Sequence, residues 1–325
     1  MRRMTRVVTG LVVALVISTA LGLASAHATA PGKNGRIAFR RYFNDDHTLG
    51  AIFTIRPNGA GVRQITHRGK VFLDNEPDWS PDGRWIAFYR QAAVCSCKPT
   101  RIFKVRPDGT HLTQISKDPS VDDVYPAWSP DGKRIAFTRY DDSIGLVAVF
   151  VMQADGTRVR QVTPTEYAGQ YPQWSPGGTR LVFQGNGRSG RHAVFTIRLN
   201  GTDVRRVSPW KLHAGDGPDW SPNGRWILLE SHDGQDRTDN LYLVHPNGSG
   251  LHRITHTFNG FHQWGSYTFS PDGTMITVAH NLRLGADGRP SNPDIWVMNL
   301  DGSGLRNVTH SAIFDSAPDW GPRPR

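Results

Sequence analysis

Pro77-Asp78-Trp79-Ser80-Pro81-Asp82-Gly83 is one copy of a motif that occurs six times in this chain of 325 residues. The other copies begin at Pro126, Pro172, Pro218, Tyr267 and Pro318. Their aromatic residues, Trp79, Trp128, Trp174, Trp220, Phe269 and Trp320, follow one another at intervals of 46 to 51 residues. A repeat of this length with several β segments per copy is typical of propeller blades.

Each period contains four short apolar segments. The first holds the aromatic residue, and the second follows the S-P-D-G turn, as in residues 84–88. The third and fourth, as in residues 52–55 and 62–66, are joined by a compact turn such as Pro57-Asn58-Gly59. Their length, apolar content and Pro/Asn/Gly punctuation favour strands over helices. We therefore predict an all-β fold.

The two ends of the repeat array complement each other. The first segment after the N-terminal region, residues 35–39, lacks an aromatic strand before it, and the strand around Trp320 lacks a partner after it. Pairing these two strands would close a ring and protect both edges from further pairing. We predict a single domain, residues 27–325. It is expected to form a six-bladed β-propeller of four-stranded blades, with the C-terminal strand completing the first blade.

Residues 1–26 have the pattern of a secretory signal peptide. Three arginines precede the uncharged apolar residues 7–23, and Ala24-Ser25-Ala26 offers a cleavage site. We predict a secreted or periplasmic protein with no membrane span after cleavage, and a retained anchor is the open alternative. Cys95 and Cys97 are too close together for a zinc knuckle or a C-x-x-C redox motif.

Net charge is +10, and removal of the predicted signal would lower it to +7. The arginines are scattered over the repeats and form no basic stripe, so we expect no nucleic-acid partner.

The pattern P-x-W-S-P-D-G, followed by R-I-A-F and then a D-G turn, resembles the PD40 (WD40-like) repeat of TolB-type propellers. The resemblance covers essentially the whole chain after the signal. It implies a propeller with one rim of structural turns and one rim of variable loops. TolB itself carries an α/β domain before its propeller, so a Tol–Pal role is not implied.

The candidate site residues lie in the loops before the aromatic strands, which we expect to pass nearest the central channel. They are Asp74, Glu76, Asp123, Gln170, His213, Asp216, His262, Gln263 and Asp315. Variable loops on a rigid scaffold commonly carry function. Carboxylates and imidazoles that converge there could hold a divalent cation or a polar ligand, although no cofactor is expected. The alternative is that these side chains are solvated or cap turns.

The chain contains no G-x-S-x-G nucleophile motif and has no room for a hydrolase domain. We therefore predict a monomeric, non-catalytic binding module for an envelope or extracellular protein, peptide or polysaccharide. The alternative is a metal-dependent polysaccharide lyase. Such a protein would resemble the oligogalacturonate lyases, whose channel metal is held by His and Gln. Gln170, His213, His262 and Gln263 are the residues available for that role.

Overall fold

The computed structural model describes residues 31–67, 71–93, 99–187, 191–214, 217–233, 238–256, 264–281 and 292–324. The predicted signal peptide, Cys95 and Cys97 lie outside these ranges. The described residues form 24 β-strands and two 3-10 helices, η1 (Thr165–Tyr167) and η2 (Trp210–Leu212). Neither helix in the described part of the chain has the length or apolar character to cross a membrane.

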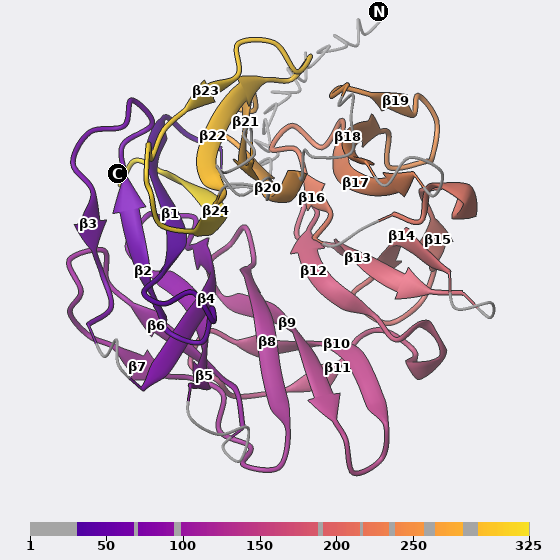
Figure 1. Cartoon of the computed structure of the whole chain (residues 1–325). Coiled ribbons are helices and arrows are strands. Elements are labelled where there is room, and N and C mark those ends of the chain that lie inside the picture. The colour runs from indigo at the N-terminus through magenta and orange to yellow at the C-terminus, as the bar shows by residue number, and fades with distance from the viewer. Residues whose placement is uncertain are drawn as a thin grey trace, which may run out of the picture.

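Four separate four-stranded sheets make up most of the molecule (Figure 1). The first contains β8 (Asp122–Trp128), β9 (Arg134–Asp141), β10 (Leu146–Gln153) and β11 (Arg160–Gln161). The second contains β12 (Gln170–Trp174), β13 (Arg180–Asn186), β14 (His192–Arg198) and β15 (Arg205–Arg206). The third contains β16 (Asp219–Trp220), β17 (Ile227–Asp233), β18 (Thr238–Val244) and β19 (His252–Arg253). The fourth contains β20 (Trp264–Phe269), β21 (Met275–His280), β22 (Asp294–Asn299) and β23 (Arg306–Asn307).

The remaining eight strands belong to one sheet. They are β24 (Asp315–Pro322), β1 (Asn34–Tyr42), β2 (Gly50–Ile55), β3 (Arg63–Gln64), β4 (Phe72–Trp79), β5 (Ile86–Ala92), β6 (Arg101–Val105) and β7 (Thr113–Gln114). Its two four-stranded halves are joined by one parallel pair, Gly50 with Leu73. The expectation of an all-β propeller built from four-stranded units is confirmed. The structure has four separate four-stranded sheets and one eight-stranded sheet, so the number of separate sheets differs from the six predicted blades, because this pair joins two four-stranded units.

The first and last strands of the described chain pair with each other. β1 and β24 are antiparallel, and Ile37 lies opposite Trp320 while Arg41 lies opposite Asp315. A Cβ atom at Gly35 would lie 2.5 Å from the carbonyl oxygen of Pro322, so the absence of a side chain there permits the close approach. Figure 1 shows the two strands adjacent, with β24 in yellow and β1 in indigo.

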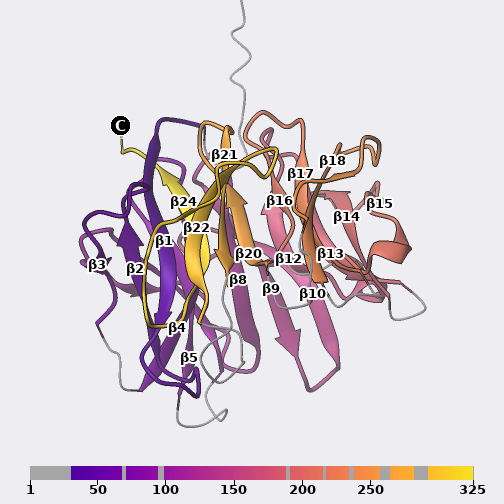
Figure 2. The ribbon, with the colours of Figure 1, turned by 45° about the horizontal axis from the view of Figure 1, so that its top comes forward.

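The aromatic strand of each repeat lies innermost. These strands, β4, β8, β12, β16, β20 and β24, contact one another in a closed cycle. In Figure 2 the strands of neighbouring sheets stand side by side around this cycle of innermost strands. The apolar core fills the gaps between neighbouring sheets. Trp128 and Phe137, for example, pack against Tyr89 and Ile102 of the preceding sheet half. Burial of these faces supplies the main driving force for the fold.

The outermost strand of each unit contains only two residues, which keeps the exposed edges short. A hydroxyl group then continues the ladder. The backbone N–H of Ile52 donates to Oγ1 of Thr66 at 3.0 Å, and that of Val149 donates to Oγ1 of Thr163 at 2.8 Å. The recurring Thr or Ser at the end of the fourth segment is therefore structural.

Candidate functional site at the central channel

The predicted site residue Glu76 lies 3.9 Å from Nη1 of Arg40. Three other predicted site residues form closer ion pairs within the fold. Each is an aspartate near the start of an innermost strand and lies directly opposite an arginine of the adjacent strand. The pairs are Asp74 with Arg90 (2.5 Å), Asp123 with Arg139 (2.7 Å) and Asp315 with Arg41 (2.6 Å). In each pair two guanidinium nitrogens reach the two carboxylate oxygens. Bidentate geometry of this kind makes strong, directional contacts.

Burial dominates the electrostatics of Asp123 and Asp315. It raises the pKa of Asp123 and of Asp315, while the arginine partners act in the opposite direction. Both carboxylates are fully buried. Because each is enclosed and paired, these three residues hold neighbouring strands together.

The other predicted residues lie in different surroundings. Gln170 accepts a hydrogen bond from the Tyr140 hydroxyl, and His213 ends η2 with a left-handed backbone. Glu76 lines the channel cavity. The remaining three, Asp216, His262 and Gln263, lie outside the described residues. Of the nine predicted residues, Glu76 is the one that the described structure places in the cavity.

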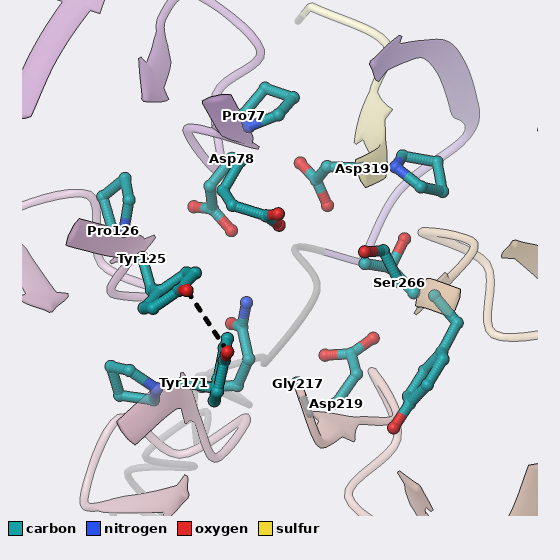
Figure 3. Close-up of a pocket in the computed structure, with 15 residues that line it drawn as sticks. Pro77, Asp78, Tyr125, Pro126, Tyr171, Gly217, Asp219, Ser266 and Asp319 are labelled. Atoms are coloured by element: carbon teal, nitrogen blue, oxygen red, sulfur yellow. Dashed lines mark hydrogen bonds between the residues drawn. The ribbon is translucent and has the colours of Figure 1, made fainter. Parts of the chain in front are cut away.

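The cavity has a volume of about 160 Å³ and lies where the innermost strands converge (Figure 3). One layer consists of the residue that precedes the motif in five repeats: Glu76, Tyr125, Tyr171 and Gly217 before the motif proline, and Ser266 before Tyr267. Each has a positive φ, between 36° and 72°. In four of these strands the register with the neighbouring strand shifts at this position. Bulges of this type redirect a side chain out of the regular alternation.

The left-handed backbone at these positions has an energetic cost. Non-glycine residues rarely adopt φ above zero, and each instance costs on the order of 1–3 kcal/mol. Tyr125 and Tyr171 adopt it nevertheless, and their hydroxyls are 3.2 Å apart with ring centroids 4.1 Å apart. Repeated strain around one cavity is typical of a binding site.

A second layer of the cavity is formed by the variable residue of the P-x-W motif. Three of these residues are the aspartates Asp78, Asp219 and Asp319. Each carboxylate accepts the backbone N–H of the aromatic residue in the following repeat. The bonds run from Trp128 to Asp78 (2.7 Å), from Phe269 to Asp219 (2.8 Å) and from Trp79 to Asp319 (2.6 Å). The carboxylates therefore link neighbouring repeats around the channel.

Burial strongly perturbs two of these carboxyl groups. It raises the pKa of Asp319 to about 7, and the nearby carboxylate of Asp219 also raises it. It raises the pKa of Asp78 well above its usual range, with a further contribution from Asp319. Like charges close together in a low-dielectric cavity disfavour simultaneous ionisation. Both shifts favour the protonated form of these carboxyl groups.

Sequence reasoning missed this layer, although a signal was present. Side chains alternate along a strand, so the residue just before the aromatic residue of the motif must face away from it. At that position the repeats contain Asp, Ala, Gln, Asp, Thr and Asp, while the flanking motif stays nearly constant. Variation at one position inside a constant motif was the available clue.

Comparisons with known proteins agree with the repeat pattern. Residues 98–268 match the PD40 family, described as the TolB beta propeller domain. The match covers more than half of the chain, and the chain belongs to this family.

The chain is also similar to individual proteins. It is 33% identical over 103 residues to the Tol-Pal system protein TolB of Anaeromyxobacter dehalogenans, which is 32% of this chain and 21% of that protein. This chain thus matches about a fifth of the length of that relative. The crystal structure of TolB from Acinetobacter baumannii superposes with a TM-score of 0.70 at 20% identity, covering 93% of this chain and 69% of that one. An oligogalacturonate lyase from Vibrio parahaemolyticus gives 0.53 at 13% identity, covering 84% and 78%. These two structural similarities concern the fold alone.

Proposed function

We propose that the protein is an exported, non-catalytic binding module that takes a peptide segment of a partner protein at the mouth of its channel. The ring of left-handed residues around the cavity carries this proposal, because the fold maintains a recurrent strain there. A cavity of about 160 Å³ admits a side chain or a chain end, and the tyrosines above it offer flat contact surfaces.

The proposal includes six blades. We propose that each half of the eight-stranded sheet acts as one blade, since each half is a four-stranded unit with its own innermost strand. Closure by β24 then completes the first blade, which keeps the channel mouth rigid.

Peptide selection tests the proposed site. A displayed library of random peptides is selected against the whole protein, and the affinity of a selected peptide is measured for variants. Tyr171→Ala should weaken binding about tenfold, which corresponds to about 1.4 kcal/mol. The control is Ile144→Ala, since Ile144 is 73% exposed and does not line the cavity. Failure to select any peptide, or equal losses in both variants, contradicts the proposal.

We also propose a divalent cation at the channel mouth, held by predicted site residues that lie outside the described ranges. Within the described ranges, no three His, Cys, Asp or Glu side chains are grouped as metal ligands. Gln170 and His213, two of the four residues available for a lyase metal, do not line the cavity. The described part of the site therefore does not fit the lyase alternative. Metal analysis, and melting with and without chelator, would detect a cation held by Asp216, His262 or Gln263.

A further inference from the structure

A single aspartate in the turn between β14 and β15 pairs with three arginines. The carboxylate of Asp203 lies 2.7 Å from Nη1 of Arg180, 2.7 Å from Nε of Arg205 and 3.3 Å from Nε of Arg198. Hydrogen bonds from Arg205 and Arg180 lower the pKa of Asp203 to about 2. The three arginines therefore form a binding site for a carboxylate, and the side chain of Asp203 occupies it.

The equivalent turn between β2 and β3 has the same three arginines without the carboxylate. Arg36, Arg56 and Arg63 occupy the positions of Arg180, Arg198 and Arg205 in the repeat, and Gly61 replaces Asp203. The backbone is the same at this position, with a φ of 67° at Gly61 and 57° at Asp203.

The two turns also hold their corresponding arginines, Arg36 and Arg180, in the same way. Nε of Arg36 donates to Oγ1 of Thr54 at 2.9 Å, and Nη2 of Arg180 donates to Oγ1 of Thr196 at 3.1 Å. Each arginine also donates to the backbone carbonyl of residue 61 or 203. The Arg36 guanidinium is thus held in the position that binds a carboxylate in the related turn.

Space and charge at this turn both favour an anion. A Cβ atom at Gly61 would lie 3.8 Å and 3.9 Å from the Nη atoms of Arg36 and 4.0 Å from Nη1 of Arg56. No ion pair joins Arg36, Arg56 or Arg63 to any carboxylate of the described residues, whereas Asp203 pairs with all three of its arginines. Burial lowers the pKa of Arg36, and the positive charges of Arg63 and Arg56 lower it further.

A cavity of about 580 Å³ opens beside this turn. Two more arginines, Arg306 and Arg323, line it together with Arg36 and Arg56, and Trp320 contributes an apolar wall. No acidic side chain lines it, and it shares no residue with the channel cavity. A ligand larger than a single carboxylate can therefore be accommodated.

We propose that Arg36, Arg56 and Arg63 form a binding site for the carboxylate of an acidic peptide. The related turn supports this ligand class, because its internal occupant is itself an aspartate side chain carried on a peptide. Guanidinium groups bind planar carboxylates through paired, charge-assisted hydrogen bonds. The site is separate from the channel mouth and does not depend on the function proposed there.

The substitution Gly61→Asp tests the site, because the new aspartate side chain would occupy it as Asp203 occupies the related turn. The probe is a fluorescently labelled tetra-aspartate peptide, titrated at low ionic strength against the whole protein. We expect Gly61→Asp to weaken binding at least about tenfold, the effect of one charge-assisted contact. The control Asn247→Asp adds the same charge to another turn, where sibling repeats already have aspartate, and should leave affinity unchanged.

The reciprocal substitution, Asp203→Gly, should create a second site and raise the number of bound peptides from one to two. Melting temperatures establish that all variants are folded. The proposal is overturned if the wild-type protein does not bind the peptide, or if Gly61→Asp and Asn247→Asp have equal effects. Tighter binding of inorganic phosphate than of the peptide would overturn the assignment to a carboxylate.

Discussion

Asp319 shows how a single buried carboxyl group couples the channel to pH. Its oxygen accepts the backbone N–H of Trp79 at 2.6 Å, and burial raises its pKa from 3.8 to about 7. The folded protein therefore binds this proton more tightly than the unfolded chain does. The resulting stability is fully present below pH 3.8 and is lost as the pH rises towards about 7.

We predict that the Asp319→Asn variant loses part of this pH dependence. The amide oxygen of the asparagine can still accept the Trp79 N–H, but the group no longer titrates. Calorimetric melting from pH 4 to pH 8 should show a smaller decline in melting temperature for the variant than for the wild-type protein. Parallel curves for the two proteins would contradict the raised pKa.

The arginine of a buried pair is predicted to act on stability alone. Arg139→Ala leaves the Asp123 carboxylate buried and unpaired, which should lower the free energy of unfolding by about 3–5 kcal/mol. The double variant Asp123→Leu/Arg139→Leu should recover much of this loss. Urea denaturation measures both effects. A stable Arg139→Ala protein with impaired peptide binding would instead place this pair in the ligand site.

At the scale of the element, the important feature is the irregularity in the innermost strands. In β12 the register shifts between Gln170 and Gln173, and Tyr171 between them has a φ of 51°. In an undistorted strand Tyr171 and Gln173, two positions apart, would lie on the same face of the sheet. The bulge and the left-handed backbone at Tyr171 interrupt the regular strand between them, and both residues line the cavity.

Two substitutions at Tyr171 separate strain from recognition. Tyr171→Gly should retain stability, because glycine adopts positive φ without strain, while peptide binding is lost. Tyr171→Val should lower the free energy of unfolding by about 1–3 kcal/mol more than the glycine variant, since β-branched residues disfavour this backbone. Thermal melting and peptide titration provide the two measurements. Equal stabilities would show that the left-handed backbone is not maintained.

At the scale of the whole molecule, the ends of the described chain are held together by strand pairing. Trp320 is almost completely buried and belongs to the core cluster that also contains Ile37 and Phe39 of β1. The Asp319 carboxylate accepts a hydrogen bond from Trp79 of β4 as well. The C-terminal strand therefore contacts both halves of the eight-stranded sheet.

Removal of residues 318–325 should sharply lower the melting temperature. The deletion exposes the edge of β1 and removes a buried tryptophan, a loss of the size of a large core truncation, about 3–5 kcal/mol from the side chain alone. The matched control is the full chain with Arg323→Ala, which changes an exposed residue of the same segment. An unchanged melting temperature after the deletion would refute closure by β24.

The repeat, the four-strand unit and the pairing of the first and last strands could all be predicted from the sequence. Repeated turn residues and aromatic residues report on local geometry, and the two incomplete ends can be completed only by each other. The merging of two units through Gly50 and Leu73 is one backbone contact, for which the sequence contains no signal.

Which polar residues face the channel follows from tertiary contacts. Asp74, Asp123 and Asp315 are polar residues of the kind expected in a binding site, yet each lies opposite an arginine of the adjacent strand in the same sheet. Glu76 and Tyr171 line the cavity at positions where the strand register shifts. Strand register and backbone φ determine where a side chain points, and both depend on contacts between segments far apart in the sequence.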